Sequence, residues 1–292
     1  MAWLLRLAAH LPLPLLHAFG AILGWLVYLG SGRYRKCLGE NLALAGYRDP
    51  DIRRAAIVEA GKGVAELPAL WLRSHEKASA LVVEAGGWSS VVSALSAGRG
   101  AILLTPHLGC FEITAQFVAR RYPITVLFSP PKLRQLEPLM HSGRDRALMK
   151  SVPPDMSGLR SMLRALHRGE AIGILPDQVP GVGEGEWEEF FGRSAYTMTL
   201  VGKLASRTGA PVVIGFAERL PGGRGFRLHA QGLPAPEPGE SFERRMNRAI
   251  ETLVRRCPAQ YLWSYNRYKV PAGVAPPGKE RGPRIEGSGD SP

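Results

Sequence analysis

Two short segments of the chain combine side chains that can move a proton. The first reads Thr-Pro-His-Leu-Gly-Cys-Phe-Glu over residues 105–112 and places His107 five residues before Glu112. A carboxylate that binds one imidazole nitrogen fixes the tautomer, which leaves the other nitrogen able to accept a proton. The second segment reads Gly-Ile-Leu-Pro-Asp-Gln over residues 173–178 and contains Asp177. The first segment is therefore a candidate for general acid–base chemistry, and the second is a candidate functional segment because a long glycine-rich loop follows Asp177.

Each segment follows a short apolar run that reads as a buried strand, over residues 101–105 and 171–175. In a parallel sheet, the residues just beyond the carboxyl ends of the strands lie at the ligand-binding edge. Gly109 allows a tight turn into the next helix, and backbone N–H groups near that helix start are candidate donors to an oxyanion. A plainer interpretation stays open, in which the histidine caps a helix and Asp177 caps a turn.

Two other segments favour binding over proton transfer. Residues 142–146 read Ser-Gly-Arg-Asp-Arg, and their two arginines, Arg144 and Arg146, are able to hold a phosphate in a fork. Most such arginines are simply solvated. Residues 260–269 interleave four aromatic side chains with two basic ones, a pattern that suits either base stacking or a packed edge near a membrane.

Several familiar sites are absent from the sequence. There is no G-x-S-x-G elbow, no P-loop, and no G-x-G-x-x-G that opens a helix. The three cysteines, Cys37, Cys110 and Cys257, lie far apart and include no CxxC pair, so neither a zinc site nor a disulfide framework is expected. Cys110 lies inside the first motif, but a small buried side chain explains it more simply than a nucleophile does. No metal and no redox cofactor is predicted.

Composition bounds the class of protein. The 292 residues are 45% hydrophobic and 21% charged, which excludes a wholly disordered chain and a transporter with many spans. The formal net charge of +12 favours an anionic partner, namely nucleic acid, an anionic membrane surface or an acidic ligand.

The N-terminal segment carries a membrane signal. No acidic or basic residue except histidine lies between Arg6 and Arg33, and residues 11–30 are long enough to cross a hydrocarbon core as a helix. Basic residues follow at once, which by the positive-inside rule places the rest of the chain in the cytoplasm. The segment is interpreted as a membrane anchor that either spans the bilayer or lies in its interface. A buried core helix and a cleaved signal peptide are the alternatives.

Apolar runs alternate with helical patterns along the rest of the chain, which predicts an α/β fold with a mostly parallel central sheet flanked by helices. The expected organisation is an anchor over residues 1–32, a catalytic domain over residues 33–270 and a disordered tail over residues 271–292. Strands are predicted at residues 81–84, 101–105, 124–128, 171–175, 212–217 and 226–230. Helices are predicted at residues 34–46, 51–74, 88–97, 108–121, 133–150, 157–168, 197–208 and 242–256.

In combination these motifs resemble the late lipid A acyltransferases, the lauroyl and myristoyl transferases of Gram-negative bacteria, within the lysophospholipid acyltransferase superfamily. The resemblance runs from the N-terminal apolar helix to the aromatic segment at residues 260–269. It rests on H-x4-E at His107 and Glu112, G-R-x-R at 143–146, R-G-E at 168–170, P-D-Q at 176–178, and F-F-G at 190–192 followed by Thr197 and Thr199.

The resemblance implies an inner-membrane enzyme with its catalytic domain on the cytoplasmic side. It would transfer a fatty acyl chain from acyl carrier protein to a hydroxyl of a lipid A precursor, with no cofactor beyond the thioester donor and no nucleic-acid partner. His107 would act as the general base, oriented by Glu112. Substrate binding is expected at Gly109, Arg144, Arg146 and Asp177.

One departure leaves the acceptor open. Ser129 stands where the resemblance leads us to expect an arginine, and Lys132 and Arg134 are the candidate replacements. The E-G-T-R type motif of the glycerol-phosphate branch is absent, which disfavours lysophosphatidate. The alternatives are another membrane lipid acceptor (a lysophospholipid or an amino-acid lipid), a thioesterase that uses water, and a basic membrane- or nucleic-acid-binding protein without enzymatic activity.

Overall fold

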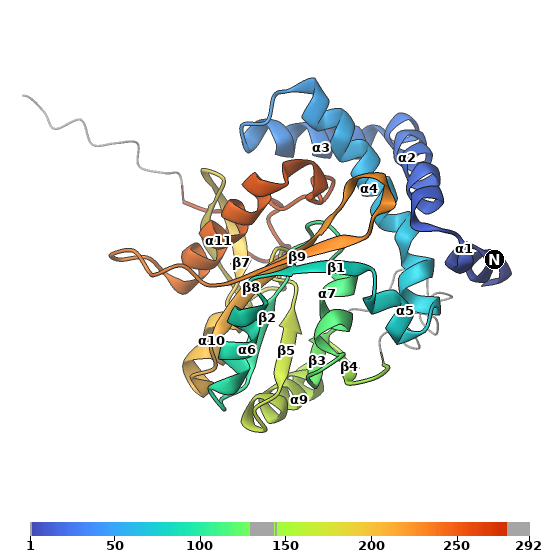
Figure 1. Ribbon diagram of the computed structural model, residues 1–292. Helices are drawn as coiled ribbons and strands as arrows, with labels where there is room; N and C mark the ends of the chain where they lie inside the picture. Colours follow the sequence, from blue (N-terminus) through green and yellow to red (C-terminus); the bar gives the residue numbers. More distant parts are fainter. Residues whose placement is uncertain (1, 129–142, 144, 279–292) are drawn as a thin grey trace, which may run out of the picture.

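A seven-stranded sheet forms the centre of the computed structural model, which describes residues 2–128, 143 and 145–278 (Figure 1). The strand order is β1-β9-β8-β2-β5-β3-β4. All neighbouring pairs are parallel except β8 and β9, so the predicted mostly parallel sheet is confirmed. The strands are β1 Val82–Gly86, β2 Ala101–Leu104, β3 Ile124–Leu127, β4 Met149–Val152, β5 Ala171–Ile174, β8 Val212–Arg219 and β9 Phe226–Gly232.

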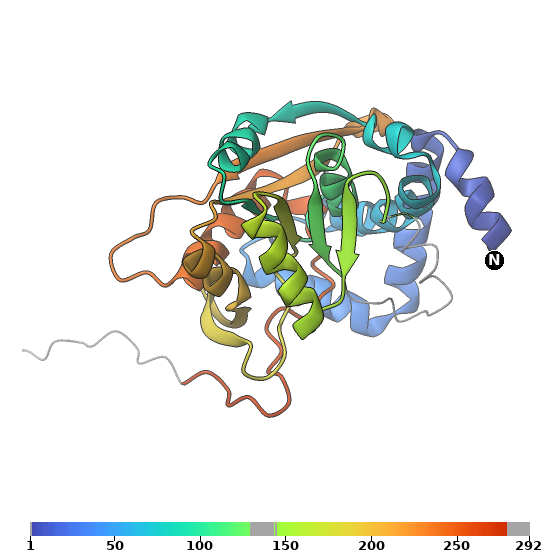
Figure 2. The ribbon, with the colours of Figure 1, turned by 90° about the horizontal axis from the view of Figure 1, so that it is seen from below.

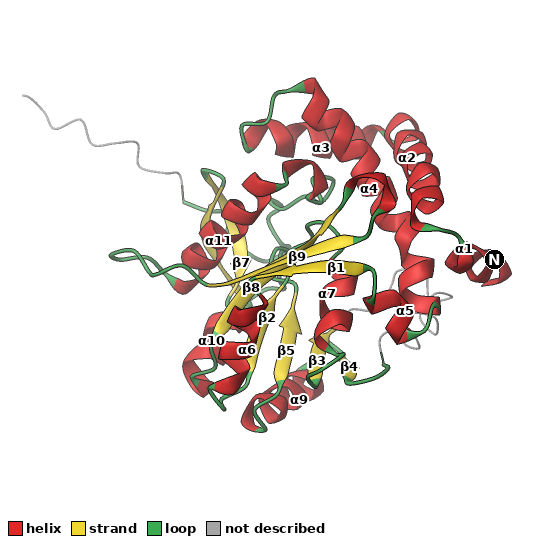
Figure 3. Ribbon diagram, in the orientation of Figure 1, coloured by secondary structure: helices red, strands yellow, loops and turns green. Residues whose placement is uncertain are grey.

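Helices cover both faces of this sheet, as Figures 2 and 3 show. Successive strand residues point to opposite faces. Leu103 and Val213 therefore pack with α6 and α7, while Ile102 and Ile214 pack with the buried residues of α9, α10 and α11. The helices are α1 Ala2–His10, α2 Leu13–Gly30, α3 Gly32–Leu44, α4 Pro50–Leu72, α5 His75–Ser79, α6 Trp88–Ser96, α7 Phe111–Val118, α9 Met156–His167, α10 Leu200–Thr208 and α11 Phe242–Arg256.

The structure differs from the sequence prediction in three places. Helix α7 begins at Phe111 instead of Leu108, because Leu108 and Gly109 form isolated bridges to Tyr261 and Ala217. Residues 149–152 form β4, where the sequence predicted the end of a helix. The rest of that predicted helix lies mostly outside the described residues.

The third difference is a hairpin in a segment expected to be a long loop. Strands β6 (Gly185–Phe190) and β7 (Arg193–Met198) pair antiparallel, so the helix predicted from residue 197 begins only at Leu200 as α10. The short turn between these strands contains Gly192 with a φ of +74°, which suits glycine.

The N-terminal apolar segment forms α2, whose buried side packs against α4. Among the described helices, α2 has the length and composition to cross a membrane, with a mean hydropathy of 1.6. At the other end of the chain, Trp187 Nε1 donates to the carbonyl of Ala275 at 2.9 Å, so this part of the expected tail contacts the hairpin. Residues 279–292 lie outside the described residues.

Candidate active site

The segments that contain His107 and Asp177 meet at the carboxyl edge of the sheet. Strands β2 and β5 are parallel neighbours with Leu104 opposite Ile174, so the loops that follow them lie side by side. Nδ1 of His107 lies 2.8 Å from Oδ1 of Asp177, and the His107 backbone N–H donates to Oδ2 of the same carboxylate at 2.9 Å. The aspartate therefore holds both the ring and the backbone of the histidine.

Asp177 is 3% exposed, and burial alone would raise the pKa of its carboxyl. The interaction with His107 and the hydrogen bonds that it receives outweigh burial and hold the pKa below its ordinary value. An ionised carboxylate accepts the Nδ1 proton of His107, which leaves Nε2 with its lone pair. The Gln178 amide lies on that atom, with Nε2 to Nε2 at 3.1 Å, and in this tautomer it donates to His107.

The carboxylate that fixes His107 is thus Asp177, which corrects the expected orienting role of Glu112. Glu112 lies in the first turn of α7, where it accepts a hydrogen bond from Trp71 Nε1 at 3.3 Å. The reason is geometric, because His107 belongs to the turn before the helix and the loop after β5 approaches its ring. Glu112 still borders the site, because its neighbour Phe111 packs on the His107 ring with the ring centroids 4.8 Å apart. Its partner Trp71 lies near the end of α4.

Gly109 is required by geometry, but its N–H does not point to a substrate. The residue has a φ of +61°, and an added Cβ would lie 2.1 Å from the carbonyl oxygen of Ala217. Its N–H donates to Gln260 O at 3.0 Å, and the N–H of Cys110 donates to Ala217 O at 2.8 Å. Both groups are committed to the protein, so the expectation that N–H groups near Gly109 bind an oxyanion is wrong for these two.

Arg146 also has a different role from the expected one. Its guanidinium donates to the carbonyls of Leu70, Trp71 and Arg73 and to Gln116 Oε1. A side chain bound to four protein acceptors caps the end of α4 and is not available to a phosphate, which corrects its predicted substrate-binding role. Arg144, Ser129, Lys132 and Arg134 lie outside the described residues.

The sequence analysis missed a third part of the site, the C-terminal segment at residues 260–267. Leu262 N–H donates to His107 O at 3.0 Å, and Tyr265 Oη accepts the N–H of Val179 at 3.0 Å. Tyr261 is buried, and its hydroxyl is close enough to Asp177 to feel the charge of that carboxylate. Burial and the nearby carboxylate together raise the pKa of Tyr261 well above its ordinary value, so the phenol stays protonated as a donor. The aromatic motif was visible in the sequence, but nothing local indicated what it packs against.

A buried ionic cluster lies behind the His107 loop. Glu66 of α4 accepts hydrogen bonds from His17 of α2 at 2.6 Å and from two nitrogens of Arg219 at 2.5 and 2.8 Å. Burial would raise the pKa of Glu66, but the Arg219 guanidinium outweighs it and keeps the pKa below its ordinary value. The backbone N–H and carbonyl of Arg219 form two hydrogen bonds with the side-chain amide of Gln260. The backbone carbonyl of Gln260 in turn accepts a hydrogen bond from the N–H of Gly109. This cluster therefore joins α2 to the loop that carries His107.

A narrow apolar cavity of about 40 Å³ lies between α6, α7 and the sheet. Its lining includes Thr105, which follows β2, and Thr114, which lies in α7, so the cavity is bounded by the segments on both sides of His107. Val91, Ala115 and Leu228 are among the apolar side chains that line it.

Neither a thiol nor a metal cluster stands out in this region. Burial raises the pKa of the Cys110 thiol well above its ordinary value, which suppresses the thiolate that a nucleophile needs. Among the residues that the structure describes, no group of three or more His, Cys, Asp or Glu side chains is placed to hold a metal ion.

The site thus consists of a histidine held by a buried aspartate, at the carboxyl edge of an α/β sheet and beside an apolar cavity, the edge at which α/β sheets bind ligands. The family model of the bacterial lipid A biosynthesis acyltransferases matches residues 1–270. The chain belongs to this family and is an enzyme of the acyltransferase class.

The chain is also similar to individual proteins. The lipid A biosynthesis lauroyltransferase of Escherichia coli K12 is 26% identical over 94% of this chain and 93% of its own length. The lipid A biosynthesis palmitoleoyltransferase of the same organism is 26% identical over 63% of this chain and 60% of its own length. Among solved structures, the 1-acyl-sn-glycerophosphate acyltransferase PlsC of Thermotoga maritima aligns with 83% of this chain and 94% of its own chain, at 15% identity and a TM-score of 0.36.

Proposed function

We propose that this enzyme transfers a fatty acyl chain from acyl carrier protein to a hydroxyl of a lipid A precursor at the cytoplasmic face of the bacterial inner membrane. Family membership supports acyl transfer in lipid A synthesis. The observation that carries the mechanism is the 2.8 Å contact between His107 Nδ1 and Asp177, which leaves Nε2 able to accept a proton.

In this mechanism the acceptor hydroxyl displaces the Gln178 amide from Nε2 of His107. Nε2 takes the hydroxyl proton while the oxygen attacks the thioester carbonyl carbon. The ester C–O bond forms as the C–S bond breaks, and the proton then passes from the imidazolium to the leaving thiolate. Asp177 stays ionised throughout and stabilises the imidazolium. General-base assistance of this kind contributes about 10²–10⁴ in rate.

The acyl chain is proposed to occupy the apolar cavity between α6, α7 and the sheet. Its walls are almost wholly apolar, and they include Thr105, two residues before His107. Burial of each methylene group there is worth about 0.8 kcal/mol, so a matching chain gains substantial binding energy. The net charge of +12 would favour encounter with an acidic carrier protein and with phosphorylated lipid.

Two residues near the site complete the proposal. The resemblance implies that Glu112 belongs to a catalytic dyad with His107; here it is proposed to act at the edge of the site through its contact with Trp71. Arg144 is proposed to bind a phosphate of the acceptor, on the resemblance alone.

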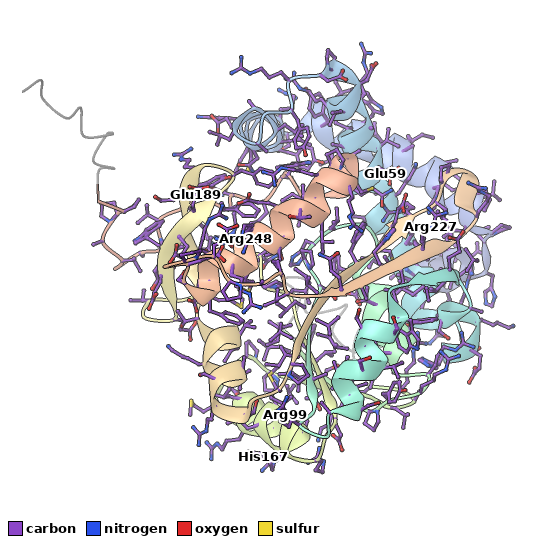
Figure 4. All side chains as sticks on the ribbon, turned by 60° about the vertical axis from the view of Figure 1, so that its left-hand side comes forward. Glu59, Arg99, His167, Glu189, Arg227 and Arg248 are labelled. Atoms are coloured by element: carbon purple, nitrogen blue, oxygen red, sulfur yellow. The ribbon has the colours of Figure 1, made fainter. Side chains whose placement is uncertain are left out.

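A transfer assay tests the proposal directly. The detergent-solubilised enzyme is given a series of acyl carrier proteins with different chain lengths and a tetra-acylated lipid A precursor. His107→Ala should abolish transfer. His167→Ala should not, because His167 ends α9 just before β5 and so lies at the edge of the sheet opposite to His107 (Figure 4 labels His167). Donor hydrolysis at a rate independent of the lipid would indicate a thioesterase. Transfer only to another lipid would correct the acceptor, and turnover by His107→Ala would refute the mechanism.

A further inference from the structure

Helix α2 has two faces of different character. Its buried residues recur at helical spacing on one side, while every exposed residue of the helix is apolar. The exposed large side chains of α1 and α2, here called the apolar face, include Trp3, Leu7, Phe19, Ile22, Leu26 and Leu29, each 59–67% exposed. A contiguous apolar surface of this kind marks an interaction site with a protein or a membrane. Figures 1 and 2 both place α1 and α2 at the outer edge of the molecule.

The opposite side of α2 is fixed on α4 by direct backbone contact. A Cβ added at Gly24 would lie 2.2 Å from Ile57 O, and one added at Gly61 would lie 2.0 Å from Gly20 O. Since Gly24 meets Ile57 while Gly20 meets Gly61, the two helices run antiparallel. Glycines at this seam let the helix axes approach more closely than larger residues would.

Polar contacts hold the start of α2 to the C-terminal end of α4. His17 donates into the buried Glu66–Arg219 pair, and Arg73, at the end of α4, donates to the carbonyls of Ala9 and Leu11 at 2.7 and 2.6 Å. Helix α2 is therefore part of the folded domain and not a tethered anchor beside it.

This arrangement conflicts with a helix that crosses the bilayer. If α2 crossed, α4 would lie in the hydrocarbon beside it, together with the charged residues Arg53, Arg54 and Lys62. A charge at the centre of a transmembrane helix costs about 2.5–3.5 kcal/mol on insertion scales. Helix α4 also packs into the domain core through Ile57 and Leu70, so the domain would have to follow it into the membrane.

We propose that α2 does not span the membrane but lies along it, with the apolar face inserted into one leaflet of an anionic phospholipid bilayer. Basic residues at both ends of the apolar stretch, Arg6 before it and Arg33, Arg35 and Lys36 after it, are exposed and suit the phosphates of that leaflet. The interfacial aromatic residue Trp25 lies on the same helix. The inference builds on the membrane location proposed above and stands whichever lipid is the acceptor.

Sidedness is the sharper of two tests. Single cysteines at Arg6→Cys and Arg33→Cys flank α2, and a membrane-impermeant maleimide is applied to intact spheroplasts and to inverted membrane vesicles. Both cysteines should react in inverted vesicles only, with the wild-type chain as the background control. Reaction of the Arg6→Cys variant from the outside would show that α2 spans the membrane and would overturn the proposal.

Binding to lipid is the second test. The triple variant Phe19→Ser, Ile22→Ser, Leu26→Ser should lose at least a hundredfold in partition onto vesicles of 70% phosphatidylcholine and 30% phosphatidylglycerol. Leu148→Ser, an exposed leucine outside α1 and α2, is the matched control and should bind as the wild type does. Unchanged binding by the triple variant would overturn the proposal. A second outcome would also overturn it: the wild type forms a dimer in solution and the triple variant does not. The apolar face would then be covered by a second copy of the chain.

Discussion

Asp177 bonds both the ring and the backbone of His107, although 70 residues separate the two. One carboxylate thereby fixes the position of the loop and the tautomer of the imidazole. A substitution that keeps the shape of Asp177 but removes its charge should therefore change the imidazole tautomer more than it changes the position of the loop.

We expect Asp177→Asn to lower kcat by about 10²–10⁴ with a much smaller effect on KM, because the amide favours the wrong imidazole tautomer. Steady-state transfer kinetics and circular dichroism of the same preparation check this. A kcat within threefold of the wild type would rule out Asp177 as the orienting group.

Glu112→Gln separates the two acidic residues. Because Asp177 still holds the imidazole in this variant, we expect a lower kcat/KM with the pH dependence of kcat unchanged. Asp177→Asn should alter that pH dependence. If Glu112→Gln shifted the pH profile and Asp177→Asn did not, the roles assigned here would have to be exchanged.

Filling the apolar cavity should change chain-length preference. Ala115→Leu adds volume to the wall, and each methylene displaced into water costs about 0.8 kcal/mol, or roughly a fourfold loss in kcat/KM. Longer donors should therefore lose more activity than shorter ones in the acyl carrier protein series. Ala97→Leu, at an exposed position just after α6, should leave the preference unchanged. Equal loss for all donors would place the chain elsewhere.

The Glu66–Arg219 pair should dominate the stability of the domain around α2. Arg219→Met leaves a buried carboxylate without its main partner, and such a loss costs about 3–5 kcal/mol. The double variant Arg219→Met, Glu66→Leu should recover part of this loss, since no charge remains unpaired. Thermal unfolding in detergent measures both variants, and a double variant less stable than Arg219→Met would contradict the argument.

Acid should weaken the fold through the same buried carboxyls. The pKa values of Glu66 and Asp177 are lowered in the folded state, so the unfolded chain binds more protons at mildly acidic pH. Their contribution is present above the ordinary carboxyl pKa values of about 4 and is lost as the pH falls through the lowered ones. Unfolding midpoints between pH 3 and 6 should therefore fall more steeply for the wild type than for Asp177→Asn.

The strands of the sheet were largely predictable because each buried strand is a short apolar run followed by a turn signal. Both strand-end segments of the site were found in this way. The partner of His107 was not, since sequence proximity favoured Glu112, and only the adjacency of β2 and β5 brings Asp177 to the ring. Strand order is a property of the whole fold and leaves no mark in either segment.

Other misses have local causes. In β6, acidic side chains at Glu186, Glu188 and Glu189 hid the strand pattern. Arg146 looked available for phosphate because its acceptors are backbone carbonyls at the end of α4, which no side-chain motif reveals. The apolar stretch at residues 11–30 was recognised, but its contact with α4 depends on glycines that are also common in spanning helices.

The segment at residues 260–265 that closes the His107 loop has a consequence for biosynthesis. The ribosome releases the apolar helices α1 and α2 early, whereas Gln260, Leu262 and Tyr265 leave the exit tunnel much later in translation. Until they arrive, His107 and the loop after Asp177 lack the backbone partners that hold them. A nascent chain therefore exposes its apolar N-terminal helices well before the His107 loop is held in its final position, so translation itself orders the two events.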